Sequence, residues 1–473
     1  MPRRPKLRIP ITPENLAERM VYKTLRWTWP FYFVGALYVV GPVLAWLLAG
    51  LAALVLYLGP AIRPELRARG TIPPVVWGWI AGMLVMLVAL WIGHLDWGLG
   101  VKKTIKSSIG WAKGWALLAL FPLAGAVLPI RREVLIRGQC IVGLWTLALL
   151  PILFIAPQIG LPERIFTSPL KAIGGPGPEY FSVYFFTWDP ASWTPRWQFY
   201  APWSPFAALL GVVQVCFALE EKDHKWRSIG IAAGVAMILL SKSRMGLIGL
   251  VACTIGPRML PLVCKGWAWQ MVAAATASLA VVGTALLQGL KDAISAFKGA
   301  RADSTRVRET LQRIARERWE NEAFWFGHGT VQPGPHIVEY MPIGSHHTWW
   351  ALLFVKGLVG LIAWAVPILW QTGLAIWDAA RGPRGRLPLA IVMTLLLLSF
   401  GENIEIEAYL LWPGLMILGI HAAELQEEAA RRRAARWRDA APQSPLPSPG
   451  GRAITSPCRT DSAPSTAPAA PSP

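Results

Sequence analysis

Apolar residues occur in this sequence mainly in long continuous runs. Runs of about 20 residues, the length needed to cross the hydrocarbon core of a bilayer, recur from Tyr22 to Ala422, with Gly, Pro and Trp inside or beside them. Segments of about 10 residues with alternating apolar and polar positions, typical of a membrane β-barrel, do not appear in the sequence. The pattern therefore predicts an all-α fold, a polytopic transmembrane helical bundle.

Short clusters of Lys and Arg separate the apolar runs and predict how the chain crosses the membrane. Short loops rich in these residues stay in the cytoplasm, so each neighbouring pair of clusters brackets one helical hairpin, and we expect about twelve spans with both chain ends inside. Lys102, Lys103 and Lys106 fall on the outer side instead, where we expect an amphipathic turn at the membrane interface. The clusters lie at Arg3–Arg8, Arg63–Arg69, Arg131–Arg137, Lys222–Arg227, around Lys265, Arg381–Arg386 and Arg431–Arg438.

Composition agrees with a chain that lies mostly in lipid. Of the 473 residues, 54% are hydrophobic and only 15% are charged, a balance that a soluble core of this size does not need. The formal charge of +19 does not indicate nucleic-acid binding, because Lys and Arg fall between apolar runs and in the tails. Scattered cysteines without CxxC or zinc-type spacing predict neither a disulfide framework nor a metal knot: Cys140, Cys216, Cys253, Cys264 and Cys458.

Spans and loops together predict seven segments. The first helix is expected to be retained, because the basic N-terminus reaches its first apolar run too late for a cleaved signal peptide. The last segment ends in a tail rich in Pro, Ala and Ser, which cannot bury enough apolar area to become ordered. The segments are a basic cytoplasmic N-terminus (1–28), transmembrane helices (29–157), a first long periplasmic loop (158–202), transmembrane helices with a Ser-Lys-Ser-Arg tip (203–287), a second long periplasmic loop (288–346), C-terminal transmembrane helices (347–422) and a cytoplasmic, then disordered, tail (423–473).

The second long loop contains a predicted helix from Asp303 to Phe324. Asp303, Ser304 and Thr305 are candidate N-caps, and three apolar residues follow at helical spacing, Val307, Leu311 and Ile314. We expect this helix to lie on the membrane surface with its apolar face toward the lipid. Long loops usually carry function, so the two outer loops are the first places to look for chemistry.

Basic residues stand in unusual contexts at four places on the expected outer face. The Ser241–Arg244 tip follows a short apolar stretch, so Lys242 and Arg244 are expected at or just below the membrane surface, where an ionisable side chain is costly and often functional. An alternative is a snorkelling hairpin tip. Several arginines around one pocket would suit a diphosphate, because guanidinium offers paired donors to phosphate oxygens. The other places are Arg196, the pair Arg306 and Arg308, and the pair His346 and His347.

The histidines and acidic residues near the expected outer face limit the reactions that the protein could catalyse. A histidine near the start of the helix at His347 could move a proton near neutral pH. Zinc is disfavoured, because His328, His336, His346 and His347 match no compact ligand spacing and no acid or thiol accompanies them. Neither long loop holds a DxD-like acidic pair and the chain has no Walker loop, which disfavours metal-held nucleotide substrates. The nearby acids could position the arginines, orient an acceptor or balance charge: Glu402, Glu405 and Glu407.

At these motifs the sequence resembles the O-antigen ligase and Wzy-type polymerase family of bacterial surface-glycan assembly, from about Arg196 to Trp370. Three blocks carry the resemblance: the Ser-Lys-Ser-Arg tip, Asp303–Arg308 leading to Phe324–Gly329, and Ser345–Trp349 leading to Lys356–Leu361. The third block is similar to the family's Ser-His-Asn block, with His347 at the position where Asn is usual.

The resemblance implies a GT-C-like bundle with a periplasmic cavity in a bacterial inner membrane. In such proteins arginines hold the diphosphate of an undecaprenyl-linked glycan while a histidine assists transfer, without a metal or other cofactor. By position, the resemblance assigns catalysis to His346, Arg244, Arg306 and Arg308, and substrate binding to Arg196, Lys242 and His347. It leaves open which of Arg306 and Arg308, and which of His346 and His347, acts.

Function is then expected to be glycosyl transfer in the assembly of O-antigen, lipopolysaccharide or exopolysaccharide. The donor would be an undecaprenyl-diphosphate-linked glycan and the acceptor a glycan or a lipid, with membrane lipids, a flippase and a chain-length regulator as further partners and no nucleic acid. Polymerase and ligase remain open, because no residue distinguishes them. A flippase that grips the same diphosphate is the main alternative, although no internal repeat typical of transporters appears. An inert scaffold would leave these arginines and histidines replaceable.

Overall fold

The computed structural model describes residues 11–59, 70–189, 192–267, 270, 288, 302–338, 340–344 and 347–440, with the backbone alone for residues 302–305 and 438–440. The chain divides into two units, Met1–Glu427 and Glu428–Pro473. All of the elements discussed below belong to the first unit, except the C-terminal turns of the last helix.

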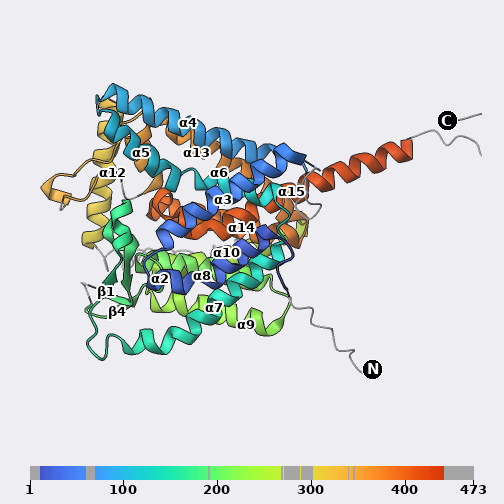
Figure 1. Cartoon of the computed structure of the whole chain (residues 1–473), viewed down its shortest axis with the longest axis horizontal. Helices are drawn as coiled ribbons and strands as arrows, with labels where there is room; N and C mark the ends of the chain where they lie inside the picture. Colours follow the sequence, from blue (N-terminus) through green and yellow to red (C-terminus); the bar gives the residue numbers. More distant parts are fainter. Residues whose placement is uncertain are drawn as a thin grey trace, which may run out of the picture. The chain divides into compact units, whose positions relative to one another are not determined.

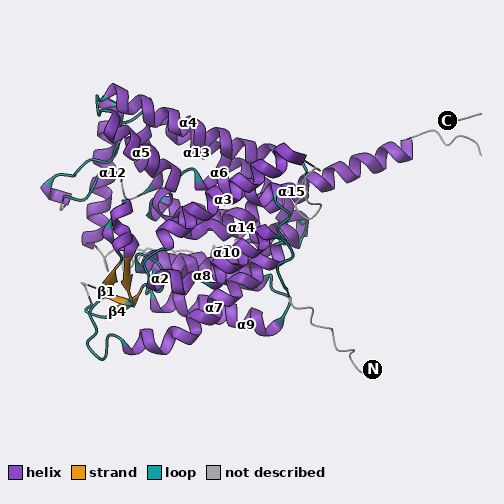
Figure 2. Ribbon diagram, viewed as in Figure 1, coloured by secondary structure: helices purple, strands orange, loops and turns teal. Residues whose placement is uncertain are grey.

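Helices dominate the described structure, and its strands are short (Figure 2). The helices are α1 (Leu16–Arg26), α2 (Thr28–Phe33), α3 (Leu37–Leu58), α4 (Pro74–Asp96), α5 (Val101–Lys113), α6 (Leu117–Val127), α7 (Arg132–Ile155), α8 (Ser204–Leu219), α9 (His224–Leu240), α10 (Arg244–Val263), α12 (Ala302–Glu322), α13 (Thr348–Arg381), α14 (Arg386–Gly401) and α15 (Ile404–Ala440). The strands are β1 (Arg164–Thr167), β2 (Ser182–Tyr184), β3 (Phe186–Trp188) and β4 (Pro195–Trp197).

Among the described residues, eight helical segments are long and apolar enough to cross a membrane. They are α3, α4, α5 together with α6, α7, α10, α13, the segment Pro383–Gly401 that contains α14, and α15 as far as Trp437. Their lipid-length apolar runs make this a helical membrane protein, as the sequence pattern predicts. The expected number of about twelve spans stays a prediction from the same pattern.

The first two helices are shorter, and together they run along α7 as far as Thr146. Asn15, before α1, donates its side-chain N–H to the carbonyl of Pro129, just before α7 begins. At the far end, the indole N–H of Trp29 donates to the hydroxyl of Thr146, and the Tyr32 hydroxyl reaches the carbonyl of Tyr184 in the first long loop. The segment 15–33 therefore runs from one end of the bundle to the other.

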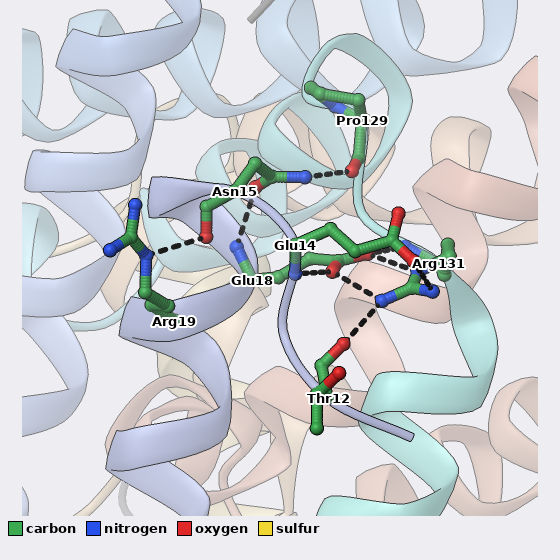
Figure 3. Close-up of polar contacts among 7 residues, drawn as sticks. All are labelled: Thr12, Glu14, Asn15, Glu18, Arg19, Pro129 and Arg131. Atoms are coloured by element: carbon green, nitrogen blue, oxygen red, sulfur yellow. Dashed lines mark hydrogen bonds and ion pairs between the residues drawn. The ribbon is translucent and has the colours of Figure 1, made fainter. Parts of the chain in front are cut away.

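One end of the bundle, which we call the basic end, gathers the predicted cytoplasmic clusters at Arg131–Arg137, Lys222–Arg227 and Arg381–Arg386; those at Arg3–Arg8 and Arg63–Arg69 lie outside the described residues. Arg137 pairs with Glu221 (2.9 Å), and Arg132 donates to the carbonyl of Arg384 (3.4 Å), so loops far apart in sequence meet here. At its centre Glu18 is fully buried and accepts from the Nε, Nη2 and peptide N–H of Arg131 at 2.8–3.0 Å (Figure 3). These pairs satisfy charges that would be costly to bury alone.

The opposite end, which we call the loop end, carries α12, the four strands, the tip between α9 and α10, and the turn between α14 and α15; Figure 1 shows α12, β1 and β4 there. The strands form two antiparallel pairs, β1 with β2 and β3 with β4. Trp197 in β4 is buried and donates its indole N–H to the carbonyl of Leu153 at the end of α7 (2.7 Å). This contact fixes the first long loop against the helices.

The helix predicted in the second long loop is confirmed as α12, but the expectation that its apolar face lies toward lipid is wrong. Val307, Leu311 and Ala315 are buried against Phe354 and Val355 of α13 and against residues of the loop that follows α12. The apolar stripe that suggested contact with lipid is therefore covered by protein. A stripe of this width can pack on a helix or on a membrane, and sequence periodicity does not separate the two cases.

Helix α13 breaks at Gly357, whose φ of 66° and ψ of −167° are not helical. The segment after α12 supplies the missing partners: the peptide N–H groups of His328 and Gly329 donate to the carbonyls of Phe354 and Val355 (2.8 and 2.9 Å). In return Leu358 donates to the carbonyl of Phe324 (2.9 Å). A broken membrane helix is tolerated where other protein groups satisfy its free backbone in this way.

Candidate functional site

The candidate site lies at the loop end, and its first part joins Arg196 to the Ser-Lys-Ser-Arg tip. Arg196 sits in β4, where pairing with β3 places it opposite Thr187. Its Nε donates to the carbonyl of Ser241 (3.3 Å), while the Ser241 hydroxyl donates to the carbonyl of Trp197 (3.0 Å). Asp189 lies 3.7 Å from Nη1 of Arg196 and orients the guanidinium. The structure thus brings together two of the four basic places that the sequence singles out.

The tip itself is a tight turn whose conformation exposes Lys242. Lys242 has a φ of 51°, a left-handed conformation that is uncommon for a residue with a side chain, and it is exposed. Ser243 then caps α10, because its hydroxyl accepts the peptide N–H of Gly246 (3.4 Å). Arg244 is the first residue of α10 and is half-buried. The tip therefore presents two cations next to a helix N-terminus, where anions are favoured.

The second part of the site is the turn between α14 and α15, which touches the tip through Met245. A Cβ on Gly401 would collide with the thioether of Met245, so α10 and the end of α14 are in close contact. Glu402 follows, and its carbonyl oxygen accepts both the peptide N–H (3.1 Å) and the hydroxyl (2.7 Å) of Thr348 at the start of α13. Three separate membrane helices therefore converge on Glu402.

Arg308 brings α12 to the same turn. Its Nη2 lies 3.8 Å from Oε1 of Glu402, and its side chain remains 44% exposed while that of Glu402 is only 9% exposed. Arg308 can therefore keep this partner and still offer donors to a ligand. Of the two arginines left open by the sequence, Arg308 is the one that the structure places against Glu402. Arg306 is also exposed on α12, across the buried Val307.

His347 stands at the entrance of α13 in a strained backbone conformation. Its φ is 102°, which a residue with a Cβ rarely adopts and which is often found at functional sites. Its Nδ1 is buried and has no hydrogen-bond partner among the residues that the structure describes. Burial, together with the positive charge of Arg308, lowers the pKa of His347 to about 4, so the ring is neutral at physiological pH. His346, the predicted catalytic histidine, lies outside the described residues.

Two buried carboxyl groups lie close in sequence at the start of α15, one of them before the helix and one in its first turns. Burial raises the pKa of Glu402 to about 7, an effect that the neighbouring Arg308 partly opposes. Glu407, in the first turns of α15, is fully buried, and neither of its carboxyl oxygens has a hydrogen-bond partner within the described part of the chain. Of the three roles open to these acids, the contact with Arg308 supports positioning of an arginine by Glu402.

His328, one of the histidines considered for zinc, has a structural environment. Its Nδ1 lies 3.0 Å from the carbonyl oxygen of Phe354, and its Nε2 lies 2.8 Å from a carboxylate oxygen of Glu322. The ring is stacked between Trp97 and Phe354, with centroids 4.8 and 4.3 Å away. Because Arg318 donates to Glu322, the pKa of Glu322 falls to about 2 and the acceptor stays ionised. Both ring nitrogens of His328 therefore contact protein oxygens, and these contacts tie the loop after α12 to the break in α13.

Some residues of the site carry no sequence signal. Asp189 and Thr348 position Arg196 and Glu402, yet each is a single polar residue beside an apolar segment. The strain at His347 comes from its backbone φ angle, which the pattern of residues does not predict. Glu402 and Glu407 could be singled out as clustered acids, but their burial could not.

Neither a protein-family model nor a curated protein sequence matches this chain. The site is therefore interpreted from its own geometry and chemistry.

Proposed function

We propose that this protein is a metal-independent glycosyltransferase that acts on an undecaprenyl-diphosphate-linked glycan at the loop end of the bundle. It either polymerises repeat units of a surface polysaccharide or ligates the glycan to an acceptor. One observation carries the proposal: the turn at Glu402 lies next to the Ser-Lys-Ser-Arg tip, to Arg308 and to the strained His347, three segments widely separated in sequence.

The chemistry of these residues suits a diphosphate leaving group. Arginine stays charged and can hold phosphate oxygens with paired donors, and Arg308 keeps nearly half of its side chain exposed for that purpose. Arg244 and Lys242 add positive charge at the N-terminus of α10. As the bond from the anomeric carbon to the diphosphate breaks, these cations stabilise the charge that builds on the leaving oxygen. His346 accepts the proton of the attacking hydroxyl.

The orientation follows from charge. The basic end carries the clusters that stay in the cytoplasm under the positive-inside rule, so the loop end faces the periplasm of a bacterial inner membrane in this proposal. A lipid-linked donor would then reach the site from the outer leaflet, and its prenyl chain would remain among the helices. This arrangement accounts for a transfer site built on membrane helices.

The test is the surface glycan of a deletion strain that carries the wild type, Arg244→Ala, Arg308→Ala or His346→Ala. Arg316→Ala is the matched control, because Arg316 is an exposed residue of α12 that pairs with Glu320 one turn on. We expect the three site variants to insert normally and lose the glycan product, while the control retains it.

Lipid-linked intermediates then identify the step. Single lipid-linked units on the outer face would indicate a polymerase, and long lipid-linked chains would indicate a ligase; both outcomes support glycosyl transfer. Units trapped on the inner face would indicate a flippase and contradict the proposal. Normal glycan in all three site variants would also contradict it.

A further inference from the structure

An apolar groove of about 540 Å³ lies between three helices at the basic end. Its walls come from the beginning of α4, from the part of α13 between Trp370 and Trp377, and from α15 between Ala422 and Gln426. The residues that line it are apolar apart from Gln426, and its volume is typical of sites for small molecules. All three helices are apolar enough to span a membrane, so the open side of the groove, where Trp370 and Trp377 are exposed, faces lipid.

Contacts between the helices fix the walls of this groove. Helices α4 and α13 lie side by side (Figure 1), and Trp370 of α13 packs on Gly78 of α4, where an added Cβ would stand 3.2 Å from the indole ring. Gln426 of α15 donates its side-chain N–H to the carbonyl and hydroxyl oxygens of Thr71, just before α4. Gly373 lines the groove without a side chain, and a Cβ there would meet no atom within 4 Å. The groove is therefore a built cleft whose space is kept open by a glycine.

A cation stands beside the groove. The guanidinium of Arg381 lies over the ring of Trp377, 3.7 Å from its centroid, and its Nη1 donates to the Trp377 carbonyl (3.2 Å). Arg381 is exposed, and no acidic residue in the described ranges pairs with it. Arg384, by contrast, is held by Asp378 at 2.6 Å. An available positive charge one turn from an apolar groove fits an amphiphile with a negative head and a hydrocarbon tail.

We propose that the groove binds one acyl chain of an anionic phospholipid, whose phosphate pairs with Arg381. Guanidinium offers paired donors to phosphate oxygens, and basic pockets between membrane helices bind anionic head groups in this way. A Trp and an Arg in neighbouring turns can anchor any membrane helix at the interface. The groove sets this place apart, because it holds room for a chain directly beside the anchor.

The prenyl chain of the proposed glycan donor is not the expected occupant. Trp370 lies 22 residues after Thr348, which places the groove about 33 Å from the start of α13 at a rise of 1.5 Å per residue. The donor's diphosphate would lie at the loop end, whereas Arg381 lies at the basic end. The phospholipid site is therefore independent of the proposed glycosyl transfer, and either proposal can fail without the other.

Lipid binding to the purified full-length protein in detergent tests the inference. The probes are phosphatidylglycerol and phosphatidylcholine with identical acyl chains, and native mass spectrometry measures how tightly each stays bound. We expect the wild type to hold one phosphatidylglycerol more tightly than phosphatidylcholine. Gly373→Leu fills the groove and should weaken both lipids at least about tenfold, because several methylene groups lose their burial. Gly50→Leu is the control, since Gly50 is an exposed residue of α3 with open space around it and does not line the groove.

A second variant tests the charge. Arg381→Gln should weaken phosphatidylglycerol about fivefold, the effect of one basic residue near an anionic membrane surface, and change phosphatidylcholine much less. Lys225→Gln, which removes an exposed cation near the start of α9, should change neither. Equal affinity of the wild type for the two lipids would overturn the inference, as would wild-type binding in both Gly373→Leu and Arg381→Gln.

Two further outcomes are decisive. If Gly373→Leu does not fold, the loss of preference for phosphatidylglycerol in Arg381→Gln decides alone. A wild-type dimer that Gly373→Leu converts to a monomer, without any change in lipid binding, would place a second copy of the chain in the groove and would overturn the inference.

Discussion

Gly327 and Gly357 lie backbone against backbone where α13 breaks. A Cβ on Gly327 would stand 2.5 Å from the peptide nitrogen of Lys356, and a Cβ on Gly357 would collide with the carbonyl of Trp325. Both glycines also have positive φ angles, 68° and 66°. The close approach lets the loop after α12 complete the hydrogen bonds of the broken helix, and it thereby sets the position of α12 and Arg308.

Replacing Gly357 with alanine should therefore destabilise the protein strongly. The backbone conformation is one that only glycine adopts readily, which alone costs about 1–3 kcal/mol, and the clash with Trp325 adds to it. Thermal unfolding of the detergent-solubilised protein measures the effect. Gly373→Ala is the control: Gly373 lies in the same helix with open space around it, so alanine should stabilise the helix by up to about 1 kcal/mol. Equal melting temperatures for the two variants would show that the break at Gly357 is not required.

A second prediction concerns Glu18 at the basic end. Glu18→Ala removes the carboxylate that accepts three N–H groups of Arg131, so we expect a loss of about 1–3 kcal/mol in the free energy of unfolding. Arg19→Ala, an exposed residue on the next position of α1, should change stability by less than about 0.5 kcal/mol. The same unfolding assay compares them. A Glu18→Ala protein as stable as the Arg19→Ala protein would contradict a stabilising role for the contacts between Glu18 and Arg131.

The sequence predicted those parts of the molecule that depend on local pattern. The membrane helices and α12 follow from apolar periodicity, although α12 begins at Ala302, before the residues that were expected to cap it. The break at Gly357 could not be predicted, because a glycine in an apolar run gives no indication of its φ angle. The three-residue strand that carries Arg196 is too short to show alternation. The contact between Arg308 and Glu402 joins two distant parts of the chain, and a single sequence does not show which distant residues will meet.

Glu402 and His347 should give the stability of the protein opposite dependences on pH. Glu402 holds its proton more tightly in the folded state, so its contribution to stability falls as pH rises from 4.5 to about 7. His347 holds its proton less tightly when folded, so its contribution rises as pH increases from about 4 to 6.5. In the wild type the two effects largely cancel where their windows overlap.

Single substitutions should separate these effects. In Glu402→Gln only the contribution of His347 to stability still depends on pH. The melting temperature should therefore rise as pH increases from about 4 to 6.5. In His347→Gln only the decrease due to Glu402 remains, and melting temperature should fall as pH rises. Melting curves recorded across both windows check the two signs. If the melting temperatures of the two variants changed with pH in the same direction, the result would contradict the expected pKa shifts of Glu402 and His347.

The last prediction is that metal chelation leaves both stability and transfer unchanged. Both ring nitrogens of His328 already lie within hydrogen-bond distance of protein oxygens, those of Phe354 and Glu322, so an ion would have to displace one of these contacts. No group of three or more His, Cys, Asp or Glu residues in the described ranges could hold a metal ion.

His328→Phe should keep the stacking on Trp97 yet lose both ring hydrogen bonds, which lowers the free energy of unfolding by about 1–3 kcal/mol. Melting temperature and transfer rate, each measured with and without a chelator, test whether the protein needs a metal ion. A loss on chelation that zinc restores in the wild type but not in His328→Phe would make His328 a metal ligand and would require a different mechanism.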